Sequence, residues 1–112
     1  MSLEICKESL KAISDTLYVI GGKWKLPIVF SLSFGEMRFH ELEREIPLIT
    51  SRMLSKELKE LEMNRIIERK VHQTMPIKVS YTLTPHGQTL KSIFEPMKEW
   101  GLMHRKKIIL DD

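Results

Sequence analysis

The sequence predicts an α+β fold that is mostly helical and forms one domain over residues 1–112. Apolar residues recur at helical spacing over most of the chain, but an alternation typical of strands replaces this spacing for a stretch after Asn64. A chain of 112 residues with 42% apolar content is long enough for one compact domain and too short for two ordinary ones. We therefore expect several helices, then a hairpin and a last helix.

The first third of the chain predicts two helices. Leu10, Ile13 and Leu17 recur at i, i+3 and i+7 within residues 8–20, which places them on one helical stripe. The glycine pair that follows breaks this helix. A second helix is expected over residues 23–33, because its proline lies near the first turn, where a missing N–H does least harm.

A short helix, a turn and a longer helix come next. The segment RFHELEREI predicts the short helix, which a proline ends, and Thr50 is the expected N-cap of the longer helix. At about 100° per residue, the longer helix has Leu54, Leu58 and Leu61 on one side. Its other side carries Arg52, Ser55, Lys56 and Lys59.

Strand periodicity begins after Asn64. Apolar and polar residues alternate in IKVSYTLT, and β-branched residues are enriched there and in IIERKVH. These two segments flank QTMP, so an antiparallel hairpin over residues 66–83 is the economical interpretation.

The last element is predicted as a helix over residues 85–107. Thr84 and Pro85 supply an N-cap and a first-turn proline, and apolar residues at helical spacing follow. Pro96 lies inside this helix and predicts a kink or break near residues 92–95, because proline removes a backbone hydrogen bond.

This order of elements predicts a winged helix-turn-helix domain. In that plan, a short helix and a brief turn precede a second helix that enters the DNA major groove. We expect the helix-turn-helix over residues 37–64 and a wing over residues 66–83, built as a two-stranded or three-stranded antiparallel sheet.

Candidate DNA contacts follow from the placement of charge, because a net charge of +3 is small for a chain with 29% charged residues. Arginine and lysine donate to the acceptors on base edges, and the N-terminus of a helix favours a phosphate. Basic hairpin residues, His72 among them, are suited to a neighbouring phosphate row or the minor groove. The predicted DNA-binding residues are Arg38, Thr50, Ser51, Arg52, Ser55, Lys56, Lys59, Arg69, Lys70 and Lys78.

The charged face of the longer helix also has an ordinary interpretation. Glu57, Glu60 and Glu62 are spaced to form solvated ion pairs with Lys56 and Lys59 in the same helix. The position of the acids favours DNA binding instead, because all of them fall outside the central basic stripe, and a basic hairpin follows.

The terminal helices are predicted to form a dimer interface. Their apolar residues would leave a monomer with a larger exposed apolar patch than soluble proteins normally tolerate, and burial between two subunits removes it. The predicted interface residues are Leu10, Ile13, Leu17, Met97, Trp100 and Met103.

The HxlR family of winged-helix transcription regulators, related to MarR-type repressors, resembles this chain from Thr16 to Lys107. The resemblance rests on VIGGKWKLPIV, MRFHELEREIPLITSRMLSKELKELEMNRIIERKV, PIKVSYTLTPHG and EWGLMHRKK, which are specific in combination. It implies a homodimer with two DNA-reading units, in which the first and last helices form the interface. It also implies that residues 50–63 are the recognition helix and residues 69–78 the wing.

We therefore expect a homodimeric, sequence-specific DNA-binding transcription regulator, acting as a repressor or autoregulator on an operator with two half-sites. One alternative is a winged-helix module that binds protein, for which the outer face of the recognition helix would be apolar or neutral. The other is an architectural protein that binds DNA without sequence preference. A small-molecule or redox effector is left open.

Cys6 is a candidate redox switch. Many members of the family carry a redox-sensing cysteine about ten residues before the first glycine of the GGKW turn, and Lys11 occupies that position here. Cys6 lies earlier in the same helix, so the alternative is that it is a small apolar residue at the dimer interface.

The sequence argues against an enzyme, a metal protein and a membrane protein. It lacks a G-x-x-x-x-G-K-[ST] loop, a G-x-S-x-G elbow and an H-E-x-x-H helix. Its four histidines form no paired spacing of the kind that zinc sites use, and one cysteine cannot form an internal disulfide. No run of about 18 apolar residues exists, and Glu4 and Glu8 are unlike a signal peptide. We expect a cytoplasmic protein without cofactor or metal.

Overall fold

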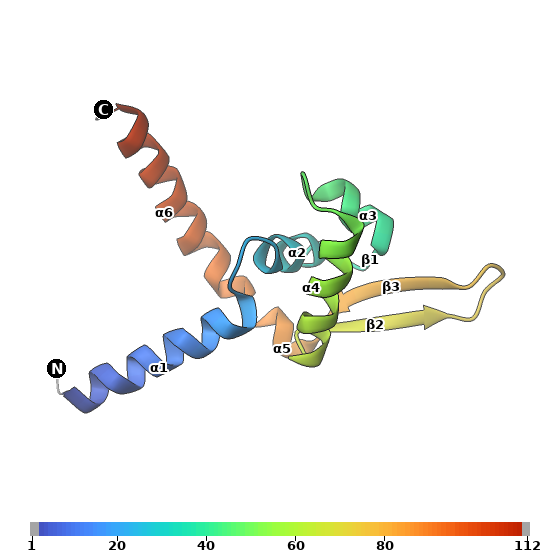
Figure 1. The fold of residues 1–112 in the computed structure, drawn as a ribbon, viewed down its shortest axis with the longest axis horizontal. Coiled ribbons are helices and arrows are strands. Elements are labelled where there is room, and N and C mark those ends of the chain that lie inside the picture. The colour runs from blue at the N-terminus through green and yellow to red at the C-terminus, as the bar shows by residue number, and fades with distance from the viewer. Residues whose placement is uncertain (1–2, 111–112) are drawn as a thin grey trace.

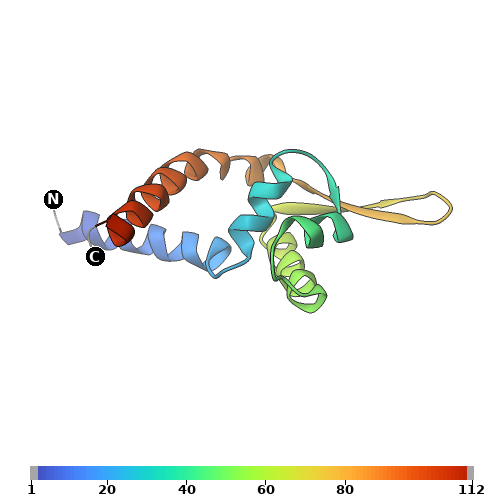
Figure 2. The same cartoon turned by 90° about the horizontal axis from the view of Figure 1, so that it is seen from above.

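The computed structural model describes residues 3–110 and shows a small body of helices and strands, from which the first and last helices extend on the same side (Figures 1 and 2). Its principal dimensions are 57 × 39 × 23 Å. The elements in chain order are α1 (Leu3–Ile20), α2 (Lys25–Leu32), β1 (Met37–Arg38), α3 (Phe39–Glu45), α4 (Ser51–Met63), β2 (Ile67–His72), β3 (Lys78–Leu83), α5 (Pro85–Gln88) and α6 (Lys91–Leu110).

The wing is part of a three-stranded antiparallel sheet with the strand order β1-β3-β2. Strands β2 and β3 pair over their full length, from Ile67 opposite Leu83 to His72 opposite Lys78. The short β1 joins the other edge of β3, where Met37 lies opposite Tyr81. The mostly helical α+β class and the hairpin are confirmed, and the sheet has three strands rather than two. In Figure 1 the hairpin projects away from the body, opposite to α1 and α6.

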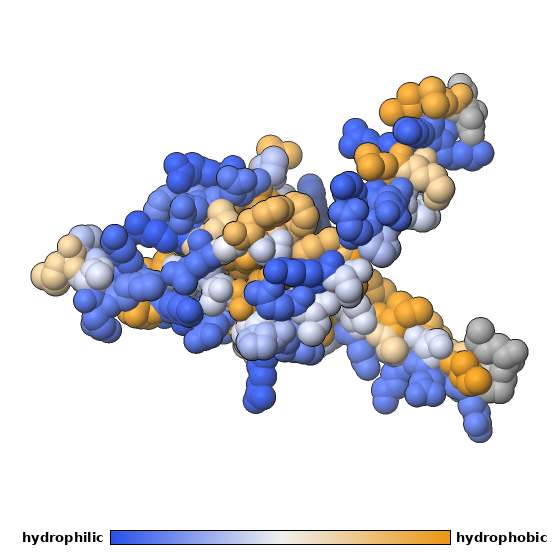
Figure 3. Space-filling model, turned by 180° about the vertical axis from the view of Figure 1, so that it is seen from behind, coloured by the Kyte–Doolittle hydropathy of each residue, from blue (hydrophilic) through white to orange (hydrophobic). Residues whose placement is uncertain are grey.

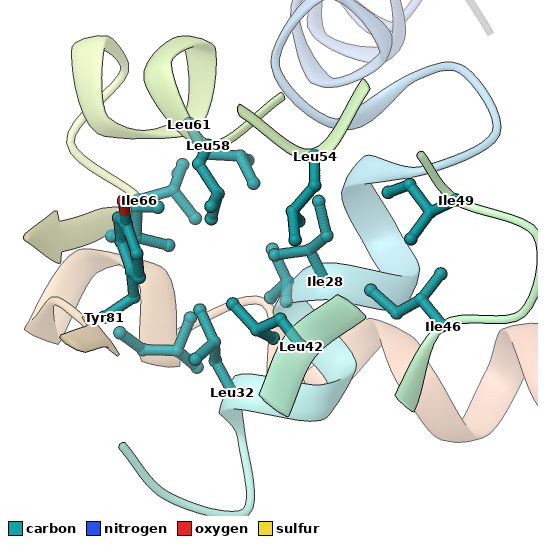
Figure 4. Packing of buried hydrophobic residues seen from close by; sticks show 13 residues of the cluster. Ile28, Leu32, Leu42, Ile46, Ile49, Leu54, Leu58, Leu61, Ile66 and Tyr81 are labelled. Atoms are coloured by element: carbon teal, nitrogen blue, oxygen red, sulfur yellow. The ribbon is translucent and has the colours of Figure 1, made fainter. Parts of the chain in front are cut away.

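The core lies between α2, α3, α4 and the base of the sheet (Figure 4). Helix α4 contributes Leu54, Leu58 and Leu61, each at most 2% exposed, as its periodicity predicts. Burying a leucine side chain contributes about 1.5–3 kcal/mol, so these three orient α4 firmly. The remaining core residues are Ile28, Val29, Leu32, Leu42, Ile46, Ile49, Ile66, Ile67, Tyr81 and Leu83.

Both ends of α4 are capped. The Thr50 hydroxyl accepts a hydrogen bond from the backbone N–H of Met53 at 3.1 Å, so the predicted N-cap is confirmed. At the other end the N–H groups of Arg65 and Ile66 donate to the carbonyls of Glu62 and Leu61, both at 3.0 Å. This is a Schellman motif, and it needs a left-handed residue, which here is Arg65 with φ +60°. The motif turns the chain directly into β2.

The end of the chain differs from the prediction. One helix with a break near residues 92–95 was expected, but the chain forms two helices that are interrupted at Thr89 and Leu90, and Pro96 lies inside a continuous α6. The physical reason is a close contact that holds α5 in place. A Cβ on Gly87 would lie 2.0 Å from the carbonyl oxygen of Ile66, so only glycine fits against the start of the wing.

The boundaries of the first two helices also differ slightly. Helix α1 begins at Leu3 within the described residues, earlier than the expected start at residue 8. Helix α2 begins at Lys25 rather than at residue 23, because Gly22 adopts φ +90° and Trp24 occupies the N-cap position. Lys25 is therefore the first residue of α2.

Candidate nucleic-acid interface

The outward face of α4 carries the basic residues that the sequence assigned to base reading. Arg52, Lys56 and Lys59 are exposed, and Ser55 between them is half-buried. Their side of the helix is opposite the leucines that enter the core, which leaves it open to a large partner. Within residues 3–110, Arg52 and Lys59 form no ion pair.

The N-terminus of α4 has its own polar contacts. Thr50 caps the helix, and the Ser51 hydroxyl donates a hydrogen bond to the carboxylate of Glu43 on α3. Both residues are exposed. Their hydroxyls therefore stabilise the helix-turn-helix, and any phosphate contact at this end falls to the backbone N–H groups.

The acids of α4 are bound to a residue that the sequence did not single out. The ammonium of Lys25 on α2 lies 2.6 Å from Oε2 of Glu57 and 2.5 Å from Oε2 of Glu60. The alternative interpretation, in which these acids pair with lysines of their own helix, is wrong for Glu57 and holds only weakly for Glu60, whose Oε1 lies 3.9 Å from Nζ of Lys56. Glu62 is exposed.

The ion pairs favour the charged forms of Lys25 and Glu60. Burial lowers the pKa of Lys25, but its hydrogen bonds to Glu57 and Glu60 outweigh this effect and raise the pKa above the ordinary 10.5. The hydrogen bond from Lys25 in turn lowers the pKa of Glu60 from its ordinary 4.5. Lys25 thus connects α2 to the recognition helix through two charged hydrogen bonds.

The wing is attached to the body by a polar cluster around Glu36, which we call the wing latch. It consists of Glu36, Lys70, His72 and Ser80. Oε2 of Glu36 accepts a hydrogen bond from the Ser80 hydroxyl at 2.6 Å, and Nε2 of His72 lies 2.8 Å from that hydroxyl and 3.2 Å from Oε2. The Lys70 ammonium lies 3.8 Å from Oε1 of Glu36. Because the Ser80 proton goes to Glu36, Nε2 of His72 must donate to the serine oxygen.

The wing lysines and Arg69 do not share one face. Residues on a strand alternate between the two faces, and Lys70, His72 and Lys78 lie on the same face as Ser80, whereas Arg69 lies opposite Tyr81 on the other face. Arg69, Lys70 and Lys78 are all exposed, as is Arg38, which lies opposite Ser80 at the edge of the sheet. The wing therefore presents positive charge on two sides.

Exposed apolar side chains follow both terminal helices (Figure 3). All six residues of the predicted dimer interface are exposed in the single chain, and Trp100 is stacked on His104 with a ring-centroid distance of 4.9 Å. Cys6 is exposed on α1. None of the helices within residues 3–110 is sufficiently long and apolar to cross a membrane.

The family model described as HxlR-like helix-turn-helix matches residues 19–108. The chain belongs to this family. Among its relatives, the HTH-type transcriptional regulator YybR of Bacillus subtilis is 48% identical over 93 residues, covering 83% of this chain and 74% of YybR. The resemblance that the sequence motifs indicated is confirmed.

Solved structures of similar proteins have the same fold as this HxlR-like chain. The structure of the HTH-type regulator YtcD is 40% identical, covers 95% of this chain and 99% of that chain, and has a TM-score of 0.79. The redox regulator HypR in its reduced form is 44% identical, covers 87% of this chain and 96% of that chain, and has a TM-score of 0.81. HypR is also known in an oxidised form, which is 46% identical with a TM-score of 0.78 and covers 82% of this chain and 95% of that chain. This family is one of transcription regulators and not of enzymes.

The sequence analysis identified the exposed basic residues of the HxlR-like chain. It missed the contacts that Lys25 and Glu36 make with α4 and the wing. Lys25 and Glu57 are 32 positions apart, and Glu36 and Ser80 are 44 positions apart, so no local pattern connects them. One signal was available for Lys25, because a lysine between Trp24 and Leu26 at the start of an apolar helix is out of place unless it has a buried partner. The predicted DNA contacts themselves stay predictions.

Replacing Glu36 with glutamine should lower the free energy of unfolding at neutral pH, with a smaller effect in acid. The hydrogen bond from Ser80, followed by the charges of Lys70 and His72, lowers the pKa of Glu36 below 4.5 despite its partial desolvation. A carboxyl with a lowered folded pKa stabilises the fold above its ordinary pKa, and this stabilisation is lost as the pH falls through the folded pKa.

Urea unfolding of wild type and Glu36→Gln from neutral pH to below about pH 3 measures this difference. Glu62→Gln, which changes an exposed acid on α4, is the matched control and should show little effect at any pH. A Glu36→Gln deficit that stays constant over the series would mean that the carboxylate charge does not hold the wing latch.

Proposed function

We propose that this HxlR-like protein is a homodimeric regulator of transcription that recognises a specific operator with the outward face of α4. The observation that carries the proposal is the separation of charge on α4. Its bases project outward, whereas Glu57 and Glu60 turn toward Lys25 at the body. Such a surface attracts a polyanion even though the helix as a whole carries as many acids as bases.

We assign base reading to Arg52 and Lys56. Both lie on the exposed face of a helix whose width suits the major groove, where guanine offers two acceptors to a basic side chain. Ser55 and Lys59 lie on the same face and are assigned to the groove edge. Phosphate contacts are assigned to the backbone N–H groups at Thr50 and Ser51 and to Arg38, Arg69, Lys70 and Lys78.

Dimerisation is proposed through α1 and α6. These helices extend from the body on the same side, and their apolar stripes are solvent-exposed in one chain (Figures 2 and 3). When two copies bury these stripes against each other, the exposed apolar surface falls to the amount that soluble proteins tolerate. The dimer then presents two recognition helices related by two-fold symmetry. An operator with two half-sites follows from that symmetry.

The basic face of α4 also distinguishes the proposal from its alternatives. A winged helix that binds protein would present an apolar or neutral outer face, and here Arg52, Lys56 and Lys59 occupy it. An architectural DNA-binding protein would make phosphate contacts without reading bases. The experiment below separates that alternative from sequence-specific binding.

The proposed control of DNA binding concerns Cys6. HypR has been solved in reduced and oxidised forms, and Cys6 of this chain is exposed on the α1 arm that we assign to dimerisation. Cys6 remains a candidate switch beside its alternative role as a small interface residue. Repression or autoregulation is the mode of action that we propose.

Arg52→Ala should lose about 1–3 kcal/mol on the preferred site and little on random duplex, because base contacts discriminate between sequences. Lys78→Ala should weaken binding to both duplexes alike and reduce the slope of log K against log salt by roughly one unit per protomer, because a phosphate contact carries no base information.

Paired titrations of wild type, Arg52→Ala and Lys78→Ala over a salt series measure both effects, with the DNA upstream of the protein's own gene as the first specific duplex. Equal losses for Arg52→Ala on both duplexes would mean that α4 is only an electrostatic surface. That outcome would favour the architectural alternative.

Ile13→Glu should weaken dimerisation at least about tenfold, because it places a charge in the proposed apolar interface. Ala12→Glu adds the same charge on another side of α1 and is the matched control, with little effect expected. Sedimentation velocity over a dilution series measures both dissociation constants. Wild-type protein that is monomeric at micromolar concentration, or equal dissociation constants for the three proteins, would contradict this interface.

A further inference from the structure

We propose that Lys25 is a positioning residue for DNA binding, which keeps Lys56 available to DNA by holding Glu60 away from it. This inference rests on the proposed function and adds to it a residue on α2 that lies behind the recognition surface. Three groups carry it: the ammonium of Lys25, the carboxylate of Glu60 and the ammonium of Lys56.

The charges of α4 make such a residue necessary. The helix contains the bases Arg52, Lys56 and Lys59 and the acids Glu57, Glu60 and Glu62, so its formal charge is zero. A helix of this composition attracts DNA only if some of its acids are neutralised by groups outside it. Lys25 forms ion pairs with two of them, and its single positive charge offsets one of their two negative charges.

Glu60 lies between two lysines that compete for it. Its Oε2 is 2.5 Å from Nζ of Lys25, whereas its Oε1 is 3.9 Å from Nζ of Lys56. The side chain of Lys25 is 11% exposed and that of Lys56 is 70% exposed. The contact with Lys25 is the shorter and the less solvated of the two, so it is the stronger.

Loss of the Lys25 charge therefore changes the partner of Glu60. Lys56 and Glu60 are spaced i, i+4 on one helix, where oppositely charged side chains meet readily. Without Lys25, Glu60 pairs with Lys56, and the ammonium of Lys56 is no longer free to donate to a base edge. Glu57 does not compete in the same way, because its side chain is 12% exposed and directed at Lys25.

The local structure around Lys25 places this residue next to α4. Lys25 is the first residue of α2, and Gly22, three residues earlier, adopts φ +90° in the connection from α1. Nζ of the neighbouring Lys23 lies 4.8 Å from the ring centre of Trp24, which orders the same short segment. Residues 21–24, which connect α1 to α2, thus set the position of Lys25.

The test is a double-mutant cycle between two backgrounds. The first is wild type, and the second is Lys25→Met/Glu57→Gln, which removes the ammonium together with the buried carboxylate beside it and leaves the net charge unchanged. Lys56→Ala is added to each background. DNA affinity is measured with the specific duplex over a salt series, after circular dichroism and thermal melting have established that each protein is folded.

In wild type, Lys56→Ala should reduce affinity for the specific duplex by about tenfold, within the range for one good base contact. In the Lys25→Met/Glu57→Gln background, affinity should already be reduced about twofold, which is the factor that an i, i+4 ion pair can supply, and Lys56→Ala should then cost about fivefold instead of tenfold. If Lys56→Ala has the same effect in both backgrounds, Lys25 does not act through Lys56, and that result would overturn the proposal.

A third substitution tests whether Glu60 is the intermediary. Adding Glu60→Gln to Lys25→Met/Glu57→Gln should restore most of the lost affinity and the effect of Lys56→Ala. Adding Glu62→Gln instead changes the net charge equally on an exposed acid and should not restore the effect of Lys56→Ala. Equal restoration by both would mean that net charge, not Glu60, is responsible.

Two outcomes separate this inference from the proposed function. If wild type does not prefer any duplex over random DNA, the proposed function fails. If wild type is specific and Lys56→Ala costs the same in both backgrounds, only the role of Lys25 fails. Should the methionine variant not fold, Lys25→Gln/Glu57→Gln removes the same charges, retains hydrogen-bonding groups, and enters the same cycle with the same expected outcomes.

Discussion

Burial of the leucine stripe of α4 is the constraint on which the rest of the structure depends. Leu54, Leu58 and Leu61 enter a core built by α2, α3 and the base of the sheet, and this fixes the rotation of the helix about its axis. The opposite face then has to meet solvent or a partner. Capping at Thr50 and the Schellman motif at Arg65 fix where that face begins and ends, and where the wing starts relative to it.

Ion pairs and hydrogen bonds then stabilise the positions of α4 and the wing, which hydrophobic packing has oriented. Lys25 forms ion pairs with Glu57 and Glu60 of α4, and the wing latch holds the hairpin through Glu36. In both places a residue outside the element that we propose to contact DNA is bound to a charged or polar side chain of that element. Helices α1 and α6 carry exposed apolar stripes, and the dimer that we propose would bury these stripes and set the distance between its two copies of α4.

Most of the fold was predictable, because it depends on local patterns. Helical spacing, strand alternation and the N-cap at Thr50 each act over a few residues, and the structure agrees with them. The break before α6 was predicted in the wrong place, because it depends on the contact of Gly87 with Ile66 across the fold rather than on Pro96. The exposed basic positions of the site were predictable for the same reason as the helices. The contacts of Lys25 and Glu36 were not predictable, since their partners Glu57 and Ser80 belong to other elements, 32 and 44 positions away in the chain.

We propose that the outward face of α4 reads DNA and that the wing contacts the DNA backbone. Amide chemical-shift mapping of the ¹⁵N-labelled protein, titrated with its specific duplex, tests this claim most directly. We expect the largest changes on residues 50–59, from the N-cap of α4 into the helix, and on the wing around Lys70 and Lys78, with small changes on α2. The largest changes on the exposed aromatic residues Phe30 and Phe34 of the body, with α4 unaffected, would contradict it.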